Sequence, residues 1–469
     1  MAGQQNDRAG TGKGLAPGAG NDPVAARLQA TLNKLLGRRM KFWVYLRLMA
    51  TMSIMLIGIR LLAQNADSGM AASSNPSLPT TQLPAHPVSF RGDGLRLISE
   101  GKSSQLRVHG FLQADGRFFS SDLKGQSPDK LFFRRIRPIF EGTLFRALDF
   151  RFMPDFGQNN PQVQDAYLEL KLLSFLKPRL GKFKTPVGLE DLRSDSESSF
   201  SERSLASDVV PLREVGAQLS GAVLRDSMSY AVGYFNGATD GSNGNFQWRT
   251  SNEGVARLFL QPFILSRAKP LRGFGVGAGG SFADESGKLP SFKTVGQNTF
   301  FKYSAEAIAD GQHNRVSPQA WYYWGSVGLI GEYTITSQQV RNGLFARRLS
   351  NRAWQATGSF MLTGEKNSYQ GMRPRRAFEP QKGIHHLGGW ELAGRYSHLN
   401  VDANAFPLFA DPKIAAASAA EWGVALNWYL NRYARIMNAY EHTSFDMASP
   451  QLAPLHSEKV VMSRLQLAF

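Results

Sequence analysis

The chain has 469 residues, a formal net charge of +17 and no cysteine, which excludes disulfides, thiolate metal sites and cysteine nucleophiles. Hydrophobic residues make up 42% and charged residues 19% of it, which excludes a bundle of membrane-spanning helices, since such a bundle needs several runs of about 20 apolar residues. Two classes stay open, a soluble all-β protein and a β-barrel in lipid, because a barrel places apolar residues only at every second position.

Three segments precede the first predicted strands. Residues 1–40 show no strong hydrophobic period and are expected to be a disordered extension or to lie before the true start. Residues 41–66 resemble a signal peptide, because the uncharged run 48–59 is short for a membrane span; Arg47 and Arg60 keep an inner-membrane anchor open as the alternative. Residues 67–93 contain four prolines and are expected to form a linker.

From residue 94 to residue 469 the sequence alternates between strand patterns and turn patterns. In the first segment, Leu106 and Val108 alternate with Arg107 and His109, as expected for a strand with one apolar and one polar face. Seventeen segments of this kind can be counted, and because single-chain bacterial barrels have an even number of strands, we expect sixteen. The segments are 106–118, 131–144, 147–153, 163–172, 177–185, 213–223, 227–235, 253–262, 271–283, 298–308, 314–324, 327–337, 351–363, 388–399, 419–430, 432–443 and 457–469.

The last segment alternates in the same way and ends on Phe469, as bacterial outer-membrane barrels do. The barrel-assembly machinery is therefore an expected partner through Phe469. We expect short turns on one rim of the barrel and long polar loops, such as 236–252 and 364–387, on the other. The predicted fold is an all-β transmembrane antiparallel barrel, localised in the bacterial outer membrane.

Several motifs, taken in order, resemble the phosphate-selective porin O/P family. They are LRVHGFLQADGRFF at 106–119, FRRIRPIFEGT at 133–143, DAYL at 165–168, LGKFKTPVGLE at 180–190, PLREVGAQLSG at 211–221 and GGWELAGRYSHL at 388–399. The resemblance implies a homotrimeric, 16-stranded porin surrounded by outer-membrane lipid, with small anionic solutes as partners. It also implies that a constriction loop, here 188–211, folds into the lumen and narrows it.

The alternation selects candidate residues for contact with the solute. Channel selectivity depends on width and on the charges that replace lost hydration, and guanidinium groups suit phosphate because they offer a planar fork of donors. If Phe132 and Ile136 face lipid, Arg135 and Arg137 face the lumen; Lys182 and Lys184 flank Phe183 and are expected to share the inner face. The candidate pore-lining and anion-binding residues are Arg117, Arg135, Arg137, Arg151, Lys182, Lys184, Arg203 and Arg213. Each of them either meets the solute or pairs with a wall carboxylate.

The expected constriction loop is itself acidic. It holds six carboxylates but only two arginines, Arg193 and Arg203. The carboxylates are Glu190, Asp191, Asp195, Glu197, Glu202 and Asp208. This balance argues against a strict phosphate filter and leaves an anion preference to the wall.

The sequence indicates no catalytic residue, metal site or cofactor. No G-x-S-x-G elbow is present, and the basic residues are spread along strand-like segments, which argues against nucleic acid as a partner. The predicted function is a passive, anion-preferring diffusion channel, with phosphate or polyphosphate among the candidate solutes. A plugged barrel with a structural or adhesive role and, less favoured, an outer-membrane hydrolase are the alternatives.

Overall fold

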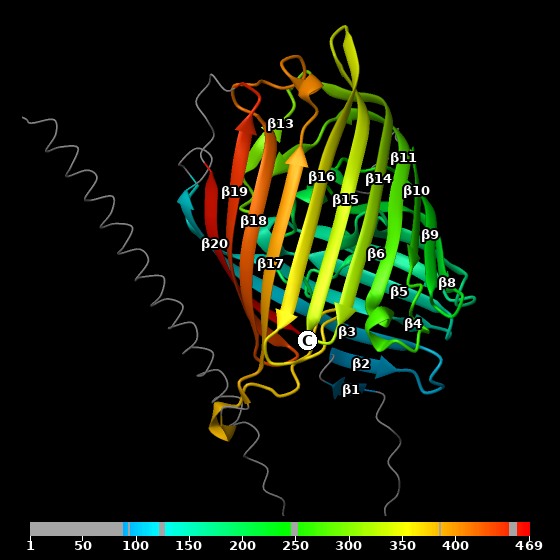
Figure 1. Cartoon of the computed structure of the whole chain (residues 1–469). Coiled ribbons are helices and arrows are strands. Elements are labelled where there is room, and N and C mark those ends of the chain that lie inside the picture. Colours follow the sequence, from blue (N-terminus) through cyan, green and yellow to red (C-terminus); the bar gives the residue numbers. More distant parts are fainter. Residues whose placement is uncertain (1–87, 92–93, 122–126, 245–251, 384–385, 450–456) are drawn as a thin grey trace, which may run out of the picture. The chain divides into compact units, whose positions relative to one another are not determined.

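The computed structural model describes residues 88–91, 94–121, 127–244, 252–383, 386–449 and 457–469 (Figure 1). The expected extension at 1–40 and the expected signal peptide at 41–66 lie outside the described residues. Of the expected linker at 67–93, only 88–91 is described. These residues form strand β1(Val88–Arg91), which pairs with β2(Gly94–Ile98), so the linker prediction was wrong for them.

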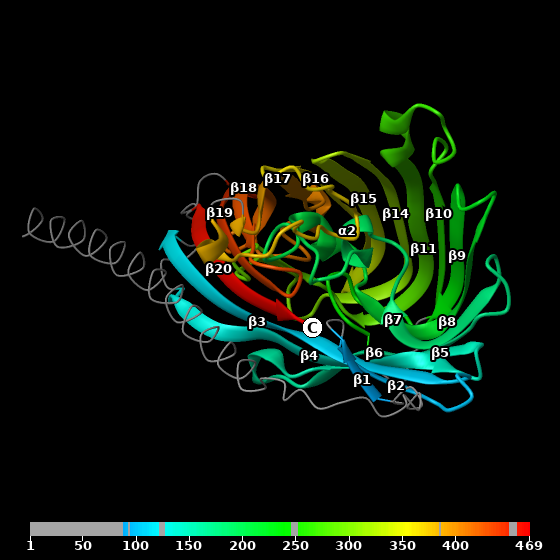
Figure 2. The ribbon, with the colours of Figure 1, turned by 90° about the horizontal axis from the view of Figure 1, so that it is seen from below.

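Sixteen antiparallel strands form a closed barrel, as predicted. They are β3(Gln105–Ser121), β4(Lys130–Leu144), β5(Leu148–Asp155), β6(Gln162–Leu170), β7(Lys177–Lys184), β8(Arg213–Val223), β9(Met228–Phe235), β10(Asn252–Leu260), β11(Phe274–Lys288), β14(Ile308–Trp324), β15(Val327–Asn342), β16(Phe345–Met361), β17(Gly389–Asn400), β18(Ala416–Tyr429), β19(Ala434–Met447) and β20(Glu458–Ala468). The ring closes because β20 pairs with β3, from Ala468 opposite Phe111 to Lys459 opposite Ser121. Figure 2 shows this ring from below, with helix α2(Leu189–Leu192) inside it.

The seventeenth predicted segment, 298–308, is not a barrel strand. Its strand β13(Thr299–Lys302) pairs only with β12(Ser291–Lys293), in a separate two-stranded sheet. The neighbouring side chains Phe300 and Phe301 are both buried, whereas a barrel strand would place one in lipid and the other in the lumen. The apolar residues of this segment therefore belong to a core inside the barrel.

The barrel wall shows the expected alternation of side chains. On β14 and β15 the apolar residues Val316, Leu329 and Tyr333 are exposed on the outer face. Between them Arg315 and Glu332 are buried on the inner face. Because a barrel in lipid has an apolar exterior and a polar interior, this pattern is the one that a transmembrane strand requires.

The predicted division into short turns on one rim and long loops on the other was wrong for one long loop. Residues 362–383 and 386–388, between β16 and β17, lie on the same rim as the short turn 430–433, whereas residues 236–244, after β9, lie on the opposite rim. The segment 362–388 is long because part of it folds inward: Tyr369 stacks on Trp321 at 4.5 Å between ring centroids. We call the rim that carries Phe469 the lower rim and the other the upper rim.

An apolar core fills part of the upper lumen. It joins the 3₁₀ helix η2(Leu205–Val209), the β12–β13 hairpin, the wall strands β14 to β18 and the 401–415 segment, where the 3₁₀ helix η6(Ala403–Ala405) lies. Phe292, Phe300, Phe301 and Phe409 are its largest buried side chains. Open space is therefore left towards the opposite wall, which the short strands β5 to β10 form.

The remaining helices in the described part of the chain are single turns in loops. They are η1(Gly157–Asn159), η3(Lys269–Gly273) and η4(Pro380–Lys382). None of the described helices is long and apolar enough to cross a membrane.

Candidate functional site

The segment 185–212, between β7 and β8, enters the barrel and is the constriction loop. Helix α2 begins it, and the backbone N–H groups of Leu189 and Glu190 donate to the two carboxylate oxygens of Glu332 on β15, at 2.7 and 3.0 Å. The hydroxyl of Tyr369, from the lower rim, donates to the carbonyl of Leu189 at 2.6 Å. The loop is thus held on the far side of the lumen from the strands that carry it.

A β-bulge on β4 brings two consecutive arginines to this loop. Gln113 pairs with Arg135 but Ala114 pairs with Phe133, so Arg134 is the extra residue. A bulge shifts the side-chain alternation by one position. As a result Phe133 is exposed outside, and Phe132 faces inward, with the guanidinium of Arg117 5.0 Å from the centre of its ring. The sequence-based placement of Phe132 in lipid was therefore wrong.

Four arginines surround the carboxylate of Glu202 in the constriction loop. Arg117 Nη2 and Arg134 Nε donate to its Oε1 at 2.7 and 2.6 Å, Arg464 Nη2 lies 3.3 Å from the same oxygen, and Arg135 Nη2 lies 3.9 Å from Oε2. These arginines hold the pKa of Glu202 well below its usual range, against the effect of burial. Since breaking a buried ion pair leaves an uncompensated charge, this cluster fixes the loop to the wall.

A second cluster surrounds Asp195, further back in the same loop. Arg137 donates from Nη1 to Asp195 and from Nε to Asp155 at 2.6 Å. Arg203 donates to Asp195 at 2.7 Å and pairs with Asp191 at 3.0 Å. Arg203 and its neighbours hold the pKa of Asp195 well below its usual range, whereas burial raises the pKa of Asp191 to about 6.

The structure thus brings together four of the predicted residues, Arg117, Arg135, Arg137 and Arg203, but their partners are acids of the constriction loop. Two others lie on the short-strand side: Arg151 pairs with Glu141 at 2.5 Å and with Asp165 at 3.2 Å, and Arg213 donates to the same Asp165 at 2.9 Å. Most of the predicted arginines are therefore neutralised by nearby carboxylates.

The two predicted lysines of β7 differ from expectation. Phe183, which was expected to face lipid, packs inside against Val187 and Val210 of the constriction loop. Lys184 nevertheless reaches the lumen, where its ammonium donates to the carbonyl of Arg193 at 2.5 Å. Lys182 is only 1% exposed and does not line either of the two cavities described next.

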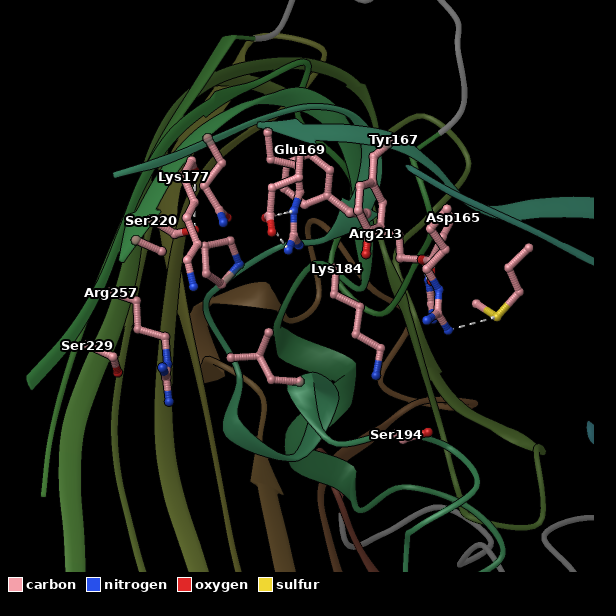
Figure 3. A pocket seen from close by; sticks show the side chains of 18 of the residues that line it. Asp165, Tyr167, Glu169, Lys177, Lys184, Ser194, Arg213, Ser220, Ser229 and Arg257 are labelled. Carbon is pink, nitrogen blue, oxygen red and sulfur yellow. Dashed lines mark hydrogen bonds and ion pairs between the residues drawn. The ribbon is translucent and has the colours of Figure 1, made fainter. Parts of the chain in front are cut away.

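Two cavities lie in the open part of the lumen. Cavity 1, of about 570 Å³, contains both Lys177 and Lys184 and so follows the whole length of β7 (Figure 3). Cavity 2, of about 610 Å³, lies towards the lower rim. The two share Phe111, Arg151 and Ser194, so they adjoin at the constriction loop.

Basic residues outnumber acidic ones in both cavities. The basic residues of cavity 1 are Arg137, Arg151, Lys177, Arg179, Lys184, Arg213 and Arg257, and its acidic residues are Asp165, Glu169 and Asp195. The basic residues of cavity 2 are Arg107, Arg151, Arg373, Arg432 and Arg435, with Glu197 as its acidic side chain. Within the described part of the chain, Lys177, Lys184, Arg257 and Arg435 have no carboxylate within ion-pair distance; Arg435 donates instead to Tyr429 and Gln466.

Sequence reasoning missed Lys177, Arg257 and Arg435. Arg257 shares its face of β10 with Val255 and Phe259, which are apolar because they pack against the constriction loop and its surroundings. The alternation of apolar and polar residues therefore places this face of β10, and Arg257 with it, against lipid. In the described residues, no group of three or more His, Asp or Glu is arranged to hold a metal ion.

Comparison with known proteins gives one family and several barrels. The family model "Phosphate-selective porin O and P" matches residues 106–469. Among solved structures, the channel DcaP of Acinetobacter baumannii is 10% identical, with 80% of this chain and 99% of that chain covered and a TM-score of 0.52. OmpF of Salmonella typhi, solved with daunomycin, is 13% identical, with 79% of this chain and 99% of that chain covered and a TM-score of 0.50. None of the curated proteins matches the chain.

Replacing Glu202 by Gln should destabilise the barrel. The change leaves four arginines facing a neutral amide, and loss of one partner of a buried ion pair costs about 3–5 kcal/mol. We expect a lower denaturation midpoint in detergent than for the wild type. Glu306→Gln, at an exposed position in the upper loop 289–307, is the matched control. Equal midpoints for the two variants would show that the cluster does not fix the loop.

Stability should also fall as the pH rises, because of Asp208. Burial raises the pKa of this carboxyl to about 8, although its Oδ2 accepts a hydrogen bond from the backbone N–H of Lys293 at 2.6 Å. The unfolded pKa is about 4, so the folded state holds the proton between about pH 4 and pH 8 and loses stability across that window. We expect the denaturation midpoint to fall between pH 5 and pH 8.5, and to fall less in Asp208→Asn. An equal fall in both proteins would exclude Asp208 as the cause.

Proposed function

Because the chain belongs to the phosphate-selective porin O and P family, and is therefore a channel of the bacterial outer membrane, we propose that it forms a passive pore that prefers small anions. Membership in a family of channels also confirms the expectation that the chain is not an enzyme. As part of the same proposal, residues 41–66 are a signal peptide that directs export.

The observation that carries the proposed preference is the excess of cations along the open part of the lumen. Cavity 1 has seven basic and three acidic side chains, and cavity 2 has five and one, with Arg151 common to both. Arg107, Arg137 and Arg151 also pair with Glu141 or Asp155 outside these linings, so the excess lies in the cations that have no carboxylate within ion-pair distance in the described residues. A narrow passage lined by one sign of charge, between walls of low dielectric constant, raises the local concentration of the opposite ion. Anions should therefore enter more readily than cations of the same size.

Four acids of the constriction loop do not oppose this preference, whereas a fifth, Glu197, lines cavity 2. Glu202 and Asp195 are enclosed by arginines, and Asp191 pairs with Arg203. Glu190 accepts hydrogen bonds from the backbone and the hydroxyl of Ser204. These carboxylates serve as internal counter-ions of the wall, so their charge is largely cancelled before it reaches the solute.

Phosphate and polyphosphate are candidate solutes rather than assigned ones. Guanidinium groups bind phosphate through paired N–H donors, and these donors must be free when the ion arrives. Arg117 and Arg134 already donate to Glu202 of the constriction loop. Arg137 donates to Asp195 and Asp155, and Arg135 donates to the amide oxygen of Gln113. Lys177, Lys184 and Arg257 have no carboxylate within ion-pair distance in the described residues; Lys184 and Arg257 donate only to uncharged acceptors, the carbonyl of Arg193 and the amide oxygen of Gln319. Their charge can attract a passing anion but does not form a phosphate site, which favours a general anion pore.

We further propose that the protein is a homotrimer. The strands β5 to β10 have only 8 to 11 residues. An eight-residue strand tilted by about 40° rises only ~20 Å, less than the apolar band of about 25 Å on outer-membrane barrels. The outer face of this low wall is apolar, with Leu168 and Leu180 exposed. Contact with neighbouring copies would cover this face.

The anion preference predicts the sign of a reversal potential. Purified protein in a planar bilayer under a KCl gradient should show discrete conductance steps. Its reversal potential should have the sign of the chloride equilibrium potential. Arg257→Gln and Lys184→Gln should each lower the anion-to-cation permeability ratio about twofold or more, because each removes a lumen charge that no carboxylate of the described residues neutralises. Arg272→Gln, in the exposed turn η3, is the control.

Two results would contradict this function. A reversal potential with the sign of the potassium equilibrium potential would show that the pore is cation-selective. The absence of conductance steps would favour the plugged barrel with a structural or adhesive role.

The trimer predicts a position-dependent effect of polar substitution. Leu180→Gln places an amide in the proposed interface on β7, whereas Leu329→Gln makes the same change on the outer face of the tall strand β15. Light scattering in detergent should give the mass of a trimer for the wild type and for Leu329→Gln, and a lower mass for Leu180→Gln. A monomeric wild type would refute the proposal.

A further inference from the structure

Cavity 1 has two chemically different walls. Strands β7 to β10 contribute Lys177, Ser220, Ser229 and Arg257 to it, and Figure 3 shows these four side chains along one wall of the cavity. On the other side, β3 and β5 contribute Phe111 and Met153. The constriction loop adds Pro186 and Leu192. A molecule in this space therefore meets cations without acidic partners and hydroxyl groups on one side. On the other side it meets apolar side chains that lie beside Arg137 and Arg151, whose charges are paired with carboxylates.

The cations of the polar wall are free to bind a solute. Arg257 Nε donates to the amide oxygen of Gln319 at 3.0 Å, and its guanidinium lies over the ring of Phe259, 4.7 Å from the centre. Both neighbours are uncharged, so the positive charge of Arg257 is not cancelled by a carboxylate in the described residues. The same holds for Lys177. By contrast, Arg137 and Arg151, on the side of Phe111 and Met153, are held by Asp155, Glu141 and Asp165.

The cations without acidic partners lie on only one side of cavity 1, and this arrangement determines which kind of anion fits. Phosphate needs hydrogen-bond donors on every side, and a hydrated oxyanion that loses water against Phe111 and Met153 gains nothing in return. Burial of an apolar group against the same side chains is favourable, by roughly 25 cal/mol per Å². The volume of about 570 Å³ also lies within the range of pockets that hold organic molecules.

We propose, on the basis of the anion-preferring function above, that cavity 1 selects organic carboxylates with an apolar body over inorganic phosphate. The carboxylate binds Arg257 and Lys177. The hydroxyl groups of Ser220 and Ser229, which now donate over 3.5 Å to the carbonyls of Lys177 and Phe259, turn to it as additional donors. The apolar body lies against Met153, Phe111 and Leu192. A charged head and an apolar body are both needed, because the cations without acidic partners lie on one side of the cavity and the apolar side chains on the other.

Probes that differ in one feature at a time test this inference. The chloride current of the wild-type protein in a planar bilayer is titrated at constant ionic strength with benzoate, acetate, inorganic phosphate and benzyl alcohol. Acetate retains the carboxylate without the apolar ring, and benzyl alcohol retains the ring without the charge. We expect benzoate to halve the current at a concentration about tenfold below that of acetate or phosphate, and benzyl alcohol to have no effect.

Two variants assign the effect to the two walls. Met153→Ser should weaken the block by benzoate and leave that by acetate unchanged, whereas Arg257→Gln should weaken both. Arg272→Gln, outside the cavities, should behave as the wild type. The titration of the wild-type chain decides the inference by itself if a variant does not fold.

The outcomes separate this inference from the proposed function. An anion-selective pore in which phosphate or acetate blocks as well as benzoate overturns the selection of organic anions and leaves the porin function intact. A cation-selective or non-conducting protein overturns the proposed function and this inference together. Equal loss of benzoate block in Arg257→Gln and Arg272→Gln would also exclude Arg257 as the binding cation.

Discussion

The structure depends on the closure of the sheet between β20 and β3. In the hydrocarbon of a bilayer an unpaired backbone N–H or C=O group has no water to bind, so a membrane-spanning sheet cannot have an open edge. Pairing from Ala468 opposite Phe111 to Lys459 opposite Ser121 removes both edges at once. The closed ring then gives every wall strand one face to lipid and one to the lumen, and both the apolar exterior and the charged interior follow from this.

Two features determine which part of the interior stays open: the ion pairs that hold the constriction loop, and the apolar core of the upper lumen. The constriction loop brings Asp195 and Glu202 to the arginines of β3, β4 and β20, and the apolar core around Phe301 fills the upper lumen beside β14 to β18. What remains is the space along β7 to β10, where Arg257 and Lys177 have no acidic partner in the described residues. The arginines that anchor the loop and the cations that can meet a solute are thus different residues.

The sequence predicts the barrel well, because lipid on one side and water on the other impose a two-residue period on most strands. The prediction fails where the inner face is apolar too. Phe183 packs against the constriction loop, and Phe300 and Phe301 lie together in the upper core, so hydrophobicity no longer marks the lipid side there. At Phe132 a bulge on the same strand reverses the alternation, and neither composition nor spacing shows it.

The candidate site could be predicted only in part, for a related reason. The sequence identifies arginines such as Arg135 and Arg137 at inward positions but not their partners, because Asp195 lies about 60 residues further on in a folded loop. Those partners determine whether the charge of an arginine is neutralised. Arg257 was missed because its apolar neighbours on the same face suggest lipid. The assignment of free and neutralised charges therefore needed the three-dimensional structure.

The most direct measurement uses the absence of cysteine in the chain. Ser194 lines both cavity 1 and cavity 2, so Ser194→Cys places a single thiol where the two parts of the proposed path meet. We expect an anionic methanethiosulfonate reagent, added to the conducting channel, to react with this thiol faster than a cationic one and to reduce the current. A thiol that neither reagent reaches, or one that the cationic reagent modifies faster, would contradict a cationic solute path beside the constriction loop.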